Sequence, residues 1–268
     1  AMGIAEYHGP RSQMMRCIDH PTMLKDGSGW GALCGVSAAR MAKAGFTGAP
    51  ALTLQTKHWH DLGENWLITK QYFKPYPVCR WAQAPIAAVL DLKQNYDFSS
   101  TDVASVHITG VYEAVRLGQK KVTNTEEAQY STSFPCAIAL VHGNILPEHI
   151  ADDALKDPEI QRLSSVLTIS EDDHANLVFP RSRLARADIT LKTGQVLSST
   201  WFEPKWDASV PPTKKELTKK FRDYAIPVLG KTRTKEIYEA VFNLDKSDTQ
   251  QLFRLISSPV QKPVANVS

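Results

Sequence analysis

The sequence predicts an α+β fold in which helical segments at both ends of the chain enclose a mixed middle. Apolar residues repeat with helical spacing before residue 45, within 86–96 and after residue 213. They repeat with a period of two within 103–109 and again within 166–202, as in half-buried strands. The 268 residues suffice for one large domain or two small ones, and no internal repeat is visible.

The N-terminal part becomes rich in glycine in the run KDGSGWG at 25–31. We expect a loop there, followed by a helix of small residues that packs tightly against other helices and ends at Gly45. Glycines free a backbone to approach a ligand closely, and Lys25 would then point at that ligand. A solvated loop lysine is the equal alternative. Both nucleotide-binding glycine motifs are absent, so we predict no nucleotide site.

The histidines and cysteines give no clear metal signal. His58 and His60 would point the same way in a strand, but no third ligand stands at a known spacing. The four cysteines lie far apart without a C-x-x-C pair, which favours reduced thiols over a disulfide framework. We therefore predict no metal and a cytoplasmic protein, with a mitochondrial location left open.

The stretch 72–81 is the most distinctive in the chain. Pro75 and Pro77 stiffen it, and it presents Lys74 and Arg80 just before a helix predicted over 86–96, with Pro85 in its first turn. Fixed cations and a helix N-terminus both favour an anionic group. The alternative is a proline-rich surface connection whose lysine and arginine are merely exposed.

The middle of the chain alternates between strands and helices. We expect a strand over 103–109 with His107 on its polar side, then a helix over 126–143 that Pro135 kinks or divides. A further helix is expected over 147–163. A strand near 166–169 and a hairpin around Thr193-Gly194 complete this part.

The C-terminal part reads as helical again. Thr213 and Glu216 form a capping box, and Gly230 is expected to end the helix that they start. Two shorter helices follow, and the tail beyond 257 is expected to fray. Lysines at 214, 215, 219 and 220 form a solvated face, and a net charge of +3 is too small to predict nucleic-acid binding. No apolar run is long enough to predict a membrane span.

Several segments, taken in order, resemble the MmgE/PrpD family. They cover most of the chain and read KDGSGWG at 25–31, GVSAA at 35–39, AGFTG at 44–48, DLGE at 61–64, FKPYP at 73–77, AQYS at 128–131 and LTKKF at 217–221. The resemblance implies an all-helical body formed by both chain ends, 1–69 and 206–268, interrupted by an α+β lid domain at 70–205. The active site of the family lies between the body and the lid.

The same resemblance implies an enzyme that needs neither metal nor organic cofactor. The family acts on small polycarboxylates by proton transfer next to a carboxylate, in dehydration, isomerisation or decarboxylation. Lys74 matches the lysine of the family's K-x-[FY]-P motif, and Lys25 matches the lysine before its small-residue helix. Both are predicted to be catalytic, and the residues predicted to contact substrate are Arg80, Tyr76, Ser28, Gln129 and Ser131.

Two departures from the family pattern limit this prediction. Family members are considerably longer, and their N-terminal helical segment carries an aspartate and histidines that nothing here replaces. Phe134 stands where many relatives have tyrosine, so one candidate acid is lost. The body is thus expected to be incomplete, and its uncovered apolar faces predict a homodimer or a partner chain that supplies the missing helices. The alternative function is a non-catalytic acid-binding or partner subunit.

Overall fold

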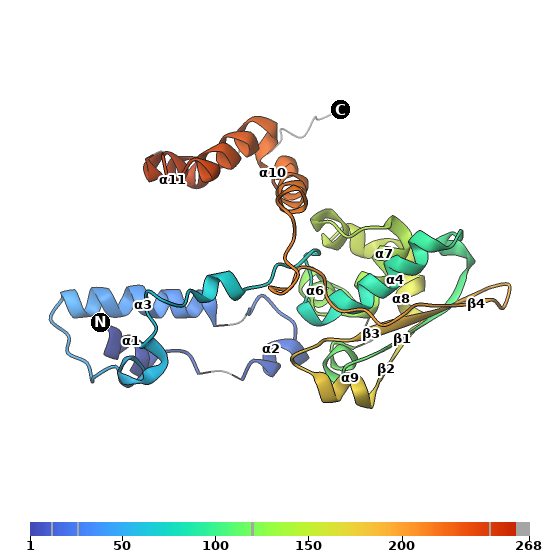
Figure 1. The fold of residues 1–268 in the computed structure, drawn as a ribbon, viewed down its shortest axis with the longest axis horizontal. Coiled ribbons are helices and arrows are strands. Elements are labelled where there is room, and N and C mark those ends of the chain that lie inside the picture. Colours follow the sequence, from blue (N-terminus) through green and yellow to red (C-terminus); the bar gives the residue numbers. More distant parts are fainter. Residues whose placement is uncertain (12, 26, 119–120, 247, 261–268) are drawn as a thin grey trace. The chain divides into compact units, whose positions relative to one another are not determined.

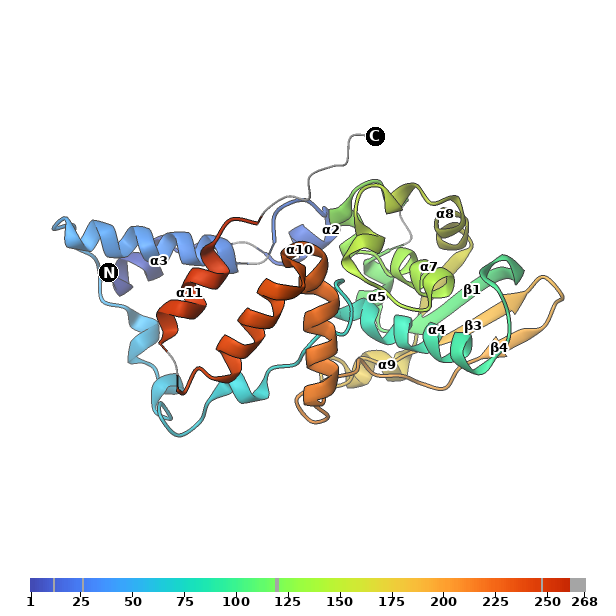
Figure 2. The same cartoon turned by 90° about the horizontal axis from the view of Figure 1, so that it is seen from above.

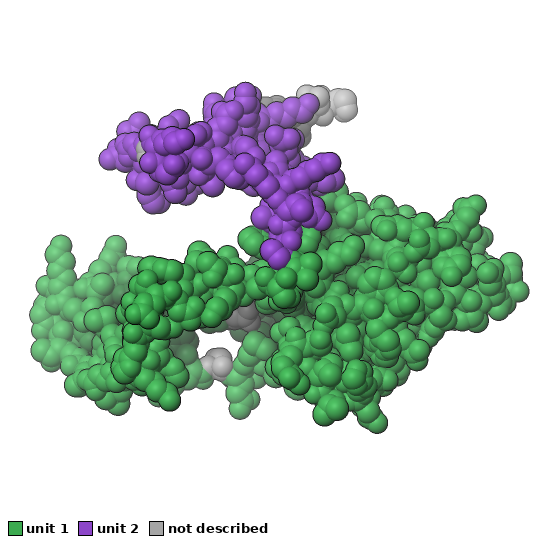
Figure 3. Space-filling view, in the orientation of Figure 1, with its two compact units in different colours: residues 1–210 green, residues 211–268 purple. Residues whose placement is uncertain are grey.

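The computed structural model describes the chain except residues 12, 26, 119–120, 247 and 261–268. The chain divides into two compact units, residues 1–210 and residues 211–268, which carry different colours in Figure 3. The predicted division into a helical body and a lid stays a prediction. No helix among the described residues combines the length and apolar character that crossing a membrane requires.

A four-stranded sheet organises the first unit. Its strands are β1 (Val103–Gly110), β2 (Leu167–Glu171), β3 (Ala185–Leu191) and β4 (Val196–Ser198), in the order β2-β1-β3-β4. Strand β1 pairs parallel with β2 and antiparallel with β3, and β3 forms a hairpin with β4. The hairpin turns at Gly194, whose φ of +89° suits glycine. The predicted strand at 103–109 and the predicted hairpin are confirmed.

Helices cover one face of this sheet (Figures 1 and 2). These are α4 (Gln83–Asn95), which packs on β3, α7 (Ser133–His142), which packs on α4, and α8 (Pro158–Ser165) beside α7. Between the layers lie fully buried aliphatic side chains, among them Ile86, Ile108, Leu140 and Ile189. The other sheet face is polar, and His107 there lies 2.8 Å from Thr168 Oγ1 and 2.9 Å from Ser170 Oγ.

The region predicted as one helix over 126–143 contains two. Helix α6 (Thr125–Gln129) ends before residues 130–132, and α7 then begins at Ser133. Pro135 lies in the first turn of α7, where a missing N–H leaves no helical hydrogen bond unmade. It therefore neither kinks nor divides a helix.

The helix predicted over 147–163 is also shorter than expected. Two 3₁₀ turns occupy 147–150 and 154–156, and α8 starts only at Pro158. Asp157 caps α8 by accepting hydrogen bonds from the backbone N–H groups of Glu159 and Ile160. Two short helices were not predicted, α5 (Tyr112–Arg116) and α9 (Asp173–Val178).

The N-terminal segment contains α1 (Met2–His8), α2 (Met15–Asp19) and α3 (Ser28–Lys43). The glycine-rich loop expected at 25–31 is wrong beyond Gly27, because α3 already begins at Ser28; Asp26 lies outside the described residues. The predicted end of α3 is confirmed by Gly45, which has a φ of +90°. Helix α3 packs against α1, and Ala38 is its one buried residue.

The second unit consists of α10 (Lys214–Phe242) and α11 (Thr249–Ser257). The predicted capping box is confirmed: Thr213 Oγ1 accepts from the Glu216 N–H at 3.3 Å, and Glu216 Oε2 accepts from the Thr213 N–H at 2.8 Å. The predicted break at Gly230 is confirmed by its φ of +76°, which interrupts α10. Most of the tail expected to fray, residues 261–268, lies outside the described residues.

Candidate functional site

The loop at 72–80 is held from inside by one buried side chain. Gln83, in the first turn of α4, donates its amide N–H groups to the carbonyl oxygens of Tyr76, Val78 and Cys79, at 3.2, 3.2 and 3.3 Å. Its own carbonyl accepts the Tyr76 N–H at 3.3 Å. Because a buried amide loses free energy for every partner it lacks, these bonds favour a single loop conformation. The predicted stiffness of this stretch thus has a second cause beyond its prolines.

Arg80 ties the same loop to residues distant in the sequence. Its guanidinium is 6% exposed and forms an ion pair with Asp207, with 2.7 Å between Nη2 and Oδ2. It stacks 3.9 Å from the centre of the Tyr72 ring. It also donates to the carbonyl oxygens of Phe73 and Lys205, at 3.5 and 3.4 Å. The fork predicted to clamp a substrate carboxylate is thus engaged by a protein carboxylate, so a clamp role would require competition with Asp207.

Residue 206 adds a strained backbone to this contact. Trp206 has a φ of +67°, a left-handed conformation that bulky residues rarely adopt. Its carbonyl oxygen accepts the Phe73 N–H at 3.0 Å, one residue before Lys74. Strain of this kind costs on the order of 1–3 kcal/mol and persists where surrounding contacts enforce it. The sequence analysis did not identify Trp206, Asp207 or Gln83 as site residues, because nothing in the local sequence distinguishes them.

Lys25 and the loop at 72–80 meet the same end of α6. The Lys25 ammonium lies 4.8 Å from the centre of the Tyr130 ring. The carbonyl oxygen of the preceding residue, Gln129, accepts the Cys79 N–H at 2.9 Å. The segments that carry Lys25 and Lys74, about fifty residues apart in the chain, therefore approach one helix end.

Lys25 also lines a surface pocket of about 280 Å³ with Met23, Gly29, Trp30 and Leu33. Lys74 is exposed and is not among the described residues that line this pocket. Ser28, predicted to contact substrate, is exposed in the first turn of α3, three residues beyond Lys25. The structure thus brings Lys25 and Ser28 to one end of α3, and their roles stay predictions.

Of two other predicted substrate contacts, one is buried and one is half-buried. Ser131 is 3% exposed, and its hydroxyl accepts the Phe134 N–H at 3.2 Å, which helps to satisfy the start of α7. Tyr76, within the loop, is half-buried, and burial raises its pKa to about 12. Its phenol is therefore neutral near pH 7 and can donate a hydrogen bond or a proton but cannot act as a base.

The sequence analysis considered His58, His60 and the cysteines as metal ligands, and the structure shows how these residues are placed. No cluster of three or more histidine, cysteine, aspartate or glutamate side chains among the described residues could hold a metal ion. His58 lies in a 3₁₀ turn at 57–59 and His60 follows it, so the strand geometry that would align them is not formed. The four cysteines are free thiols.

Comparison with known proteins shows two kinds of similarity. The model of the MmgE/PrpD C-terminal domain matches residues 76–246. Cis-aconitate decarboxylase of Aspergillus terreus strain NIH 2624 / FGSC A1156 is 23% identical over 215 residues. A second cis-aconitate decarboxylase of Aspergillus terreus is 22% identical over the same length. Each match covers 76% of this chain and 44% of the relative, so the chain spans less than half the length of either enzyme.

Proposed function

The chain belongs to the MmgE/PrpD family, and from this premise we propose that it serves a lyase that acts on a small carboxylic acid. The reaction class is proton transfer at a carbon next to a carboxylate. Removing that proton leaves an electron pair that spreads onto the carboxylate as an enolate-like charge. The pair then expels hydroxide, which leaves as water after taking up a proton, in dehydration, or takes a proton back in isomerisation. In decarboxylation the pair comes instead from the broken bond to the departing carbon dioxide, and the carbon then takes up a proton.

One observation carries this proposal: two lysine-bearing segments approach the same end of α6. An ammonium group beside the substrate carboxylate lowers the free energy of the enolate-like transition state. A neutral lysine can also take the proton, and a neutral phenol such as Tyr76 can return one. We therefore propose Lys74 and Lys25 as catalytic residues, with the division of roles between them open to experiment.

A non-catalytic role is the second candidate, and a specific observation favours it. Phe134 supplies no hydroxyl at a position that is fully buried. A subunit of this kind would bind an acid, or complete a partner, without turning substrate over. Both candidates predict binding of small acids, so binding alone cannot separate them.

The partner proposal rests on exposed apolar side chains in the first unit. Among those more than half exposed are Met23, Leu24, Trp30, Leu33, Val36, Phe46, Leu52, Leu62, Trp66, Leu67 and Ile68. Exposed apolar surface on this scale marks an interaction site more often than a free surface. We propose that a second copy or a partner chain covers it. Light scattering at micromolar concentration should then show a dimer, and a monodisperse monomer would count against the homodimer.

Hydrogen–deuterium exchange at the substrate carbon separates catalysis from binding. The chain would be incubated in D₂O with cis-aconitate or a citrate-like acid, alone and with a candidate partner chain, and followed by proton NMR. Loss of the proton signal next to the carboxylate reports proton transfer whatever product follows. Thermal stabilisation by the acid without any exchange would favour the non-catalytic subunit.

Replacing Lys74 tests the residue assignment. Lys74→Ala should slow exchange at least about a hundredfold, the usual scale for losing an acid–base or electrostatic group. Lys74→Arg keeps the charge but gives up a titratable amine, so partial activity would indicate charge stabilisation. Lys70→Ala removes another exposed lysine, from the 3₁₀ turn at 67–70, and should leave the rate unchanged. Full activity of Lys74→Ala would remove this residue from the mechanism.

A further inference from the structure

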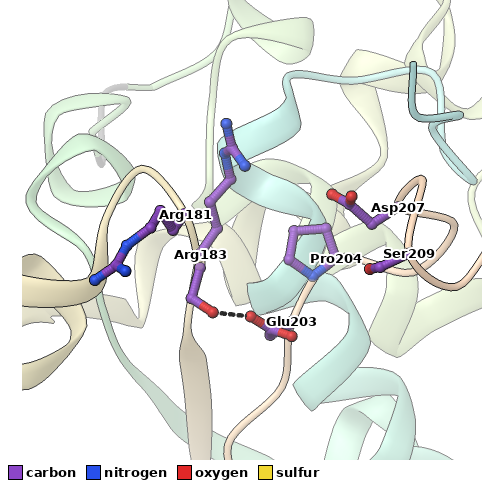
Figure 4. A pocket seen from close by; sticks show the side chains of 7 residues that line it. Arg181, Arg183, Glu203, Pro204, Asp207 and Ser209 are labelled. Carbon is purple, nitrogen blue, oxygen red and sulfur yellow. Dashed lines mark hydrogen bonds between the residues drawn. The ribbon is translucent and has the colours of Figure 1, made fainter. Parts of the chain in front are cut away.

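A separate pocket of about 230 Å³ lies in the first unit, on residues that neither the family motifs nor the predicted site include. Its lining residues are Arg181, Ser182, Arg183, Glu203, Pro204, Asp207 and Ser209. They come from the segment before β3 and from the segment after the β3–β4 hairpin. In Figure 4, Arg183 and Asp207 face each other across the opening, whereas the guanidinium of Arg181 points away from it.

Both carboxylates of this pocket already have partners. Asp207 Oδ2 accepts from Arg80, and Asp207 Oδ1 accepts the Ala208 N–H at 2.7 Å. Glu203 accepts a hydrogen bond from the Ser182 hydroxyl, which Figure 4 marks with a dashed line. The negative charge of Asp207 is thus offset by Arg80. The remaining charged groups of the pocket are one carboxylate, Glu203, and two arginines, Arg181 and Arg183.

Arg183 has hydrogen-bonding capacity in this pocket that the protein does not use. Its Nε is buried and has no hydrogen-bond partner among the described residues, as is also true of the Nε of Arg80. Its guanidinium lies 5.8 Å from the centre of the Phe179 ring, a cation–π contact that does not use its N–H groups as hydrogen-bond donors. A buried donor without a partner is destabilising, because it has given up its hydrogen bonds to water.

Arg183 and Arg80 also repel each other. Burial lowers the pKa of Arg80, and the positive charge of Arg183 lowers it further, against the opposing effects of Tyr72 and Asp207. An anion beside Arg183 would offset this repulsion and could accept its unused N–H groups. The two carboxylates that line the pocket disfavour a multiply charged anion, and the planar fork of arginine matches a carboxylate in size and geometry.

We propose that this pocket binds the carboxylate of a small monocarboxylic acid, held by the guanidinium of Arg183. Neither Lys25 nor Lys74 lines this pocket, so the proposal does not depend on the function proposed above. It borders the Arg80–Asp207 ion pair, and that pair holds the loop that carries Lys74. A bound acid would therefore lie next to the tether of the proposed catalytic loop.

Titration with propionate at constant ionic strength tests the proposal, with binding followed by ligand-observed NMR. Inorganic phosphate and succinate serve as multiply charged comparisons and should bind more weakly. Arg183→Gln should weaken propionate binding at least about tenfold, the scale of one charge-assisted hydrogen bond. Arg183→Lys keeps the charge without the fork and should lose an intermediate amount, which covers the case in which Arg183→Gln does not fold.

Two matched variants make the result specific. Arg181→Gln removes a charge at the same pocket whose guanidinium points away, and Lys74→Ala removes the proposed catalytic lysine. Both should bind propionate within about twofold of the parent chain, because neither is placed to contact the anion. Equal weakening by Arg181→Gln, unchanged binding by Arg183→Gln, or no binding of propionate at all would each overturn the proposal. Loss of binding in Lys74→Ala would place the acid at the loop instead.

Discussion

Helices α7 and α3 are both built largely from small and apolar residues, yet their surroundings are opposite. Eight of the ten residues of α7 are buried, from Ser133 to Leu140, and the helix packs against α4 and α8. Helix α3 is longer, at 16 residues, and buries Ala38 alone. Trp30, Leu33 and Val36 lie three residues apart along it and are each more than half exposed. The same kind of sequence thus forms a core in one place and an open face in the other.

The difference shows that a helix rich in apolar residues needs other groups to pack against it. Its composition does not tell which groups these are. The α+β region of residues 83–202 closes its core mainly with its own helices and strands, and Ile18 of α2, Val78 and Ala82 complete that core. Residues 23–68 instead expose many of their apolar side chains, so the stability of α3 should depend on what binds to that exposed surface. The following predictions compare the two regions, beginning with the largest expected effect.

The largest contrast should come from truncating one apolar side chain on each helix. Phe134 is fully buried, so Phe134→Ala should lower the free energy of unfolding by about 3–5 kcal/mol. Val36 is 58% exposed, and Val36→Ala should change it by less than about 0.5 kcal/mol. Urea denaturation of the two variants measures both values. A cost for Val36→Ala close to that for Phe134→Ala would mean that α3 is covered in solution and would remove the contrast.

A smaller effect is expected at the strained contact next to the loop. Trp206→Ala and Trp206→Gly both remove the indole ring, but only glycine adopts a φ of +67° without strain. Trp206→Gly should therefore be more stable than Trp206→Ala by about 1 kcal/mol. The difference between these two melting curves isolates the backbone contribution from lost packing. Equal stabilities would show that residue 206 leaves the left-handed region in solution.

The smallest effect should arise at the solvent end of α7, where the packed region has a titratable weak point. The rings of His142 and His149 stack, with centres 4.1 Å apart, and His149 Nδ1 accepts the Leu146 N–H at 3.2 Å. Burial, and next the neighbouring His142, lower the pKa of His149. The unfolded chain therefore binds a proton at a higher pH than the folded chain does.

The sign of the pH dependence follows from that difference. The contribution of His149 to stability is complete above its unfolded pKa of about 6.5 and declines as the pH falls towards the lowered folded value. Melting temperatures measured from pH 8 down to pH 5 should show this decline, and His149→Gln should flatten it. A pH profile unchanged by His149→Gln would assign the decline to other groups.

Much of the local structure could be predicted because it depends on neighbours in the chain. The strand at 103–110, the hairpin at Gly194, the capping box of Thr213 and the helix end at Gly45 each follow from a few adjacent residues. The start of α3 could not be predicted in this way, since glycines at 27–31 favour a loop on propensity. The break between α6 and α7 was placed wrongly for a related reason: proline tolerates the first turn of a helix as well as it ends one.

The family, the strands, the longer helices and the lysines that are candidates for catalysis could be identified from the sequence itself, because motifs and periodicity depend on residues close together in the chain. Which groups those residues meet was decided by the tertiary structure. The sequence predicts that Arg80 binds a substrate carboxylate. In the folded chain Arg80 pairs instead with Asp207, 127 residues away in the sequence. Such pairing depends on how the chain returns over the sheet, and a contact between residues so far apart leaves no local pattern that sequence reasoning can detect.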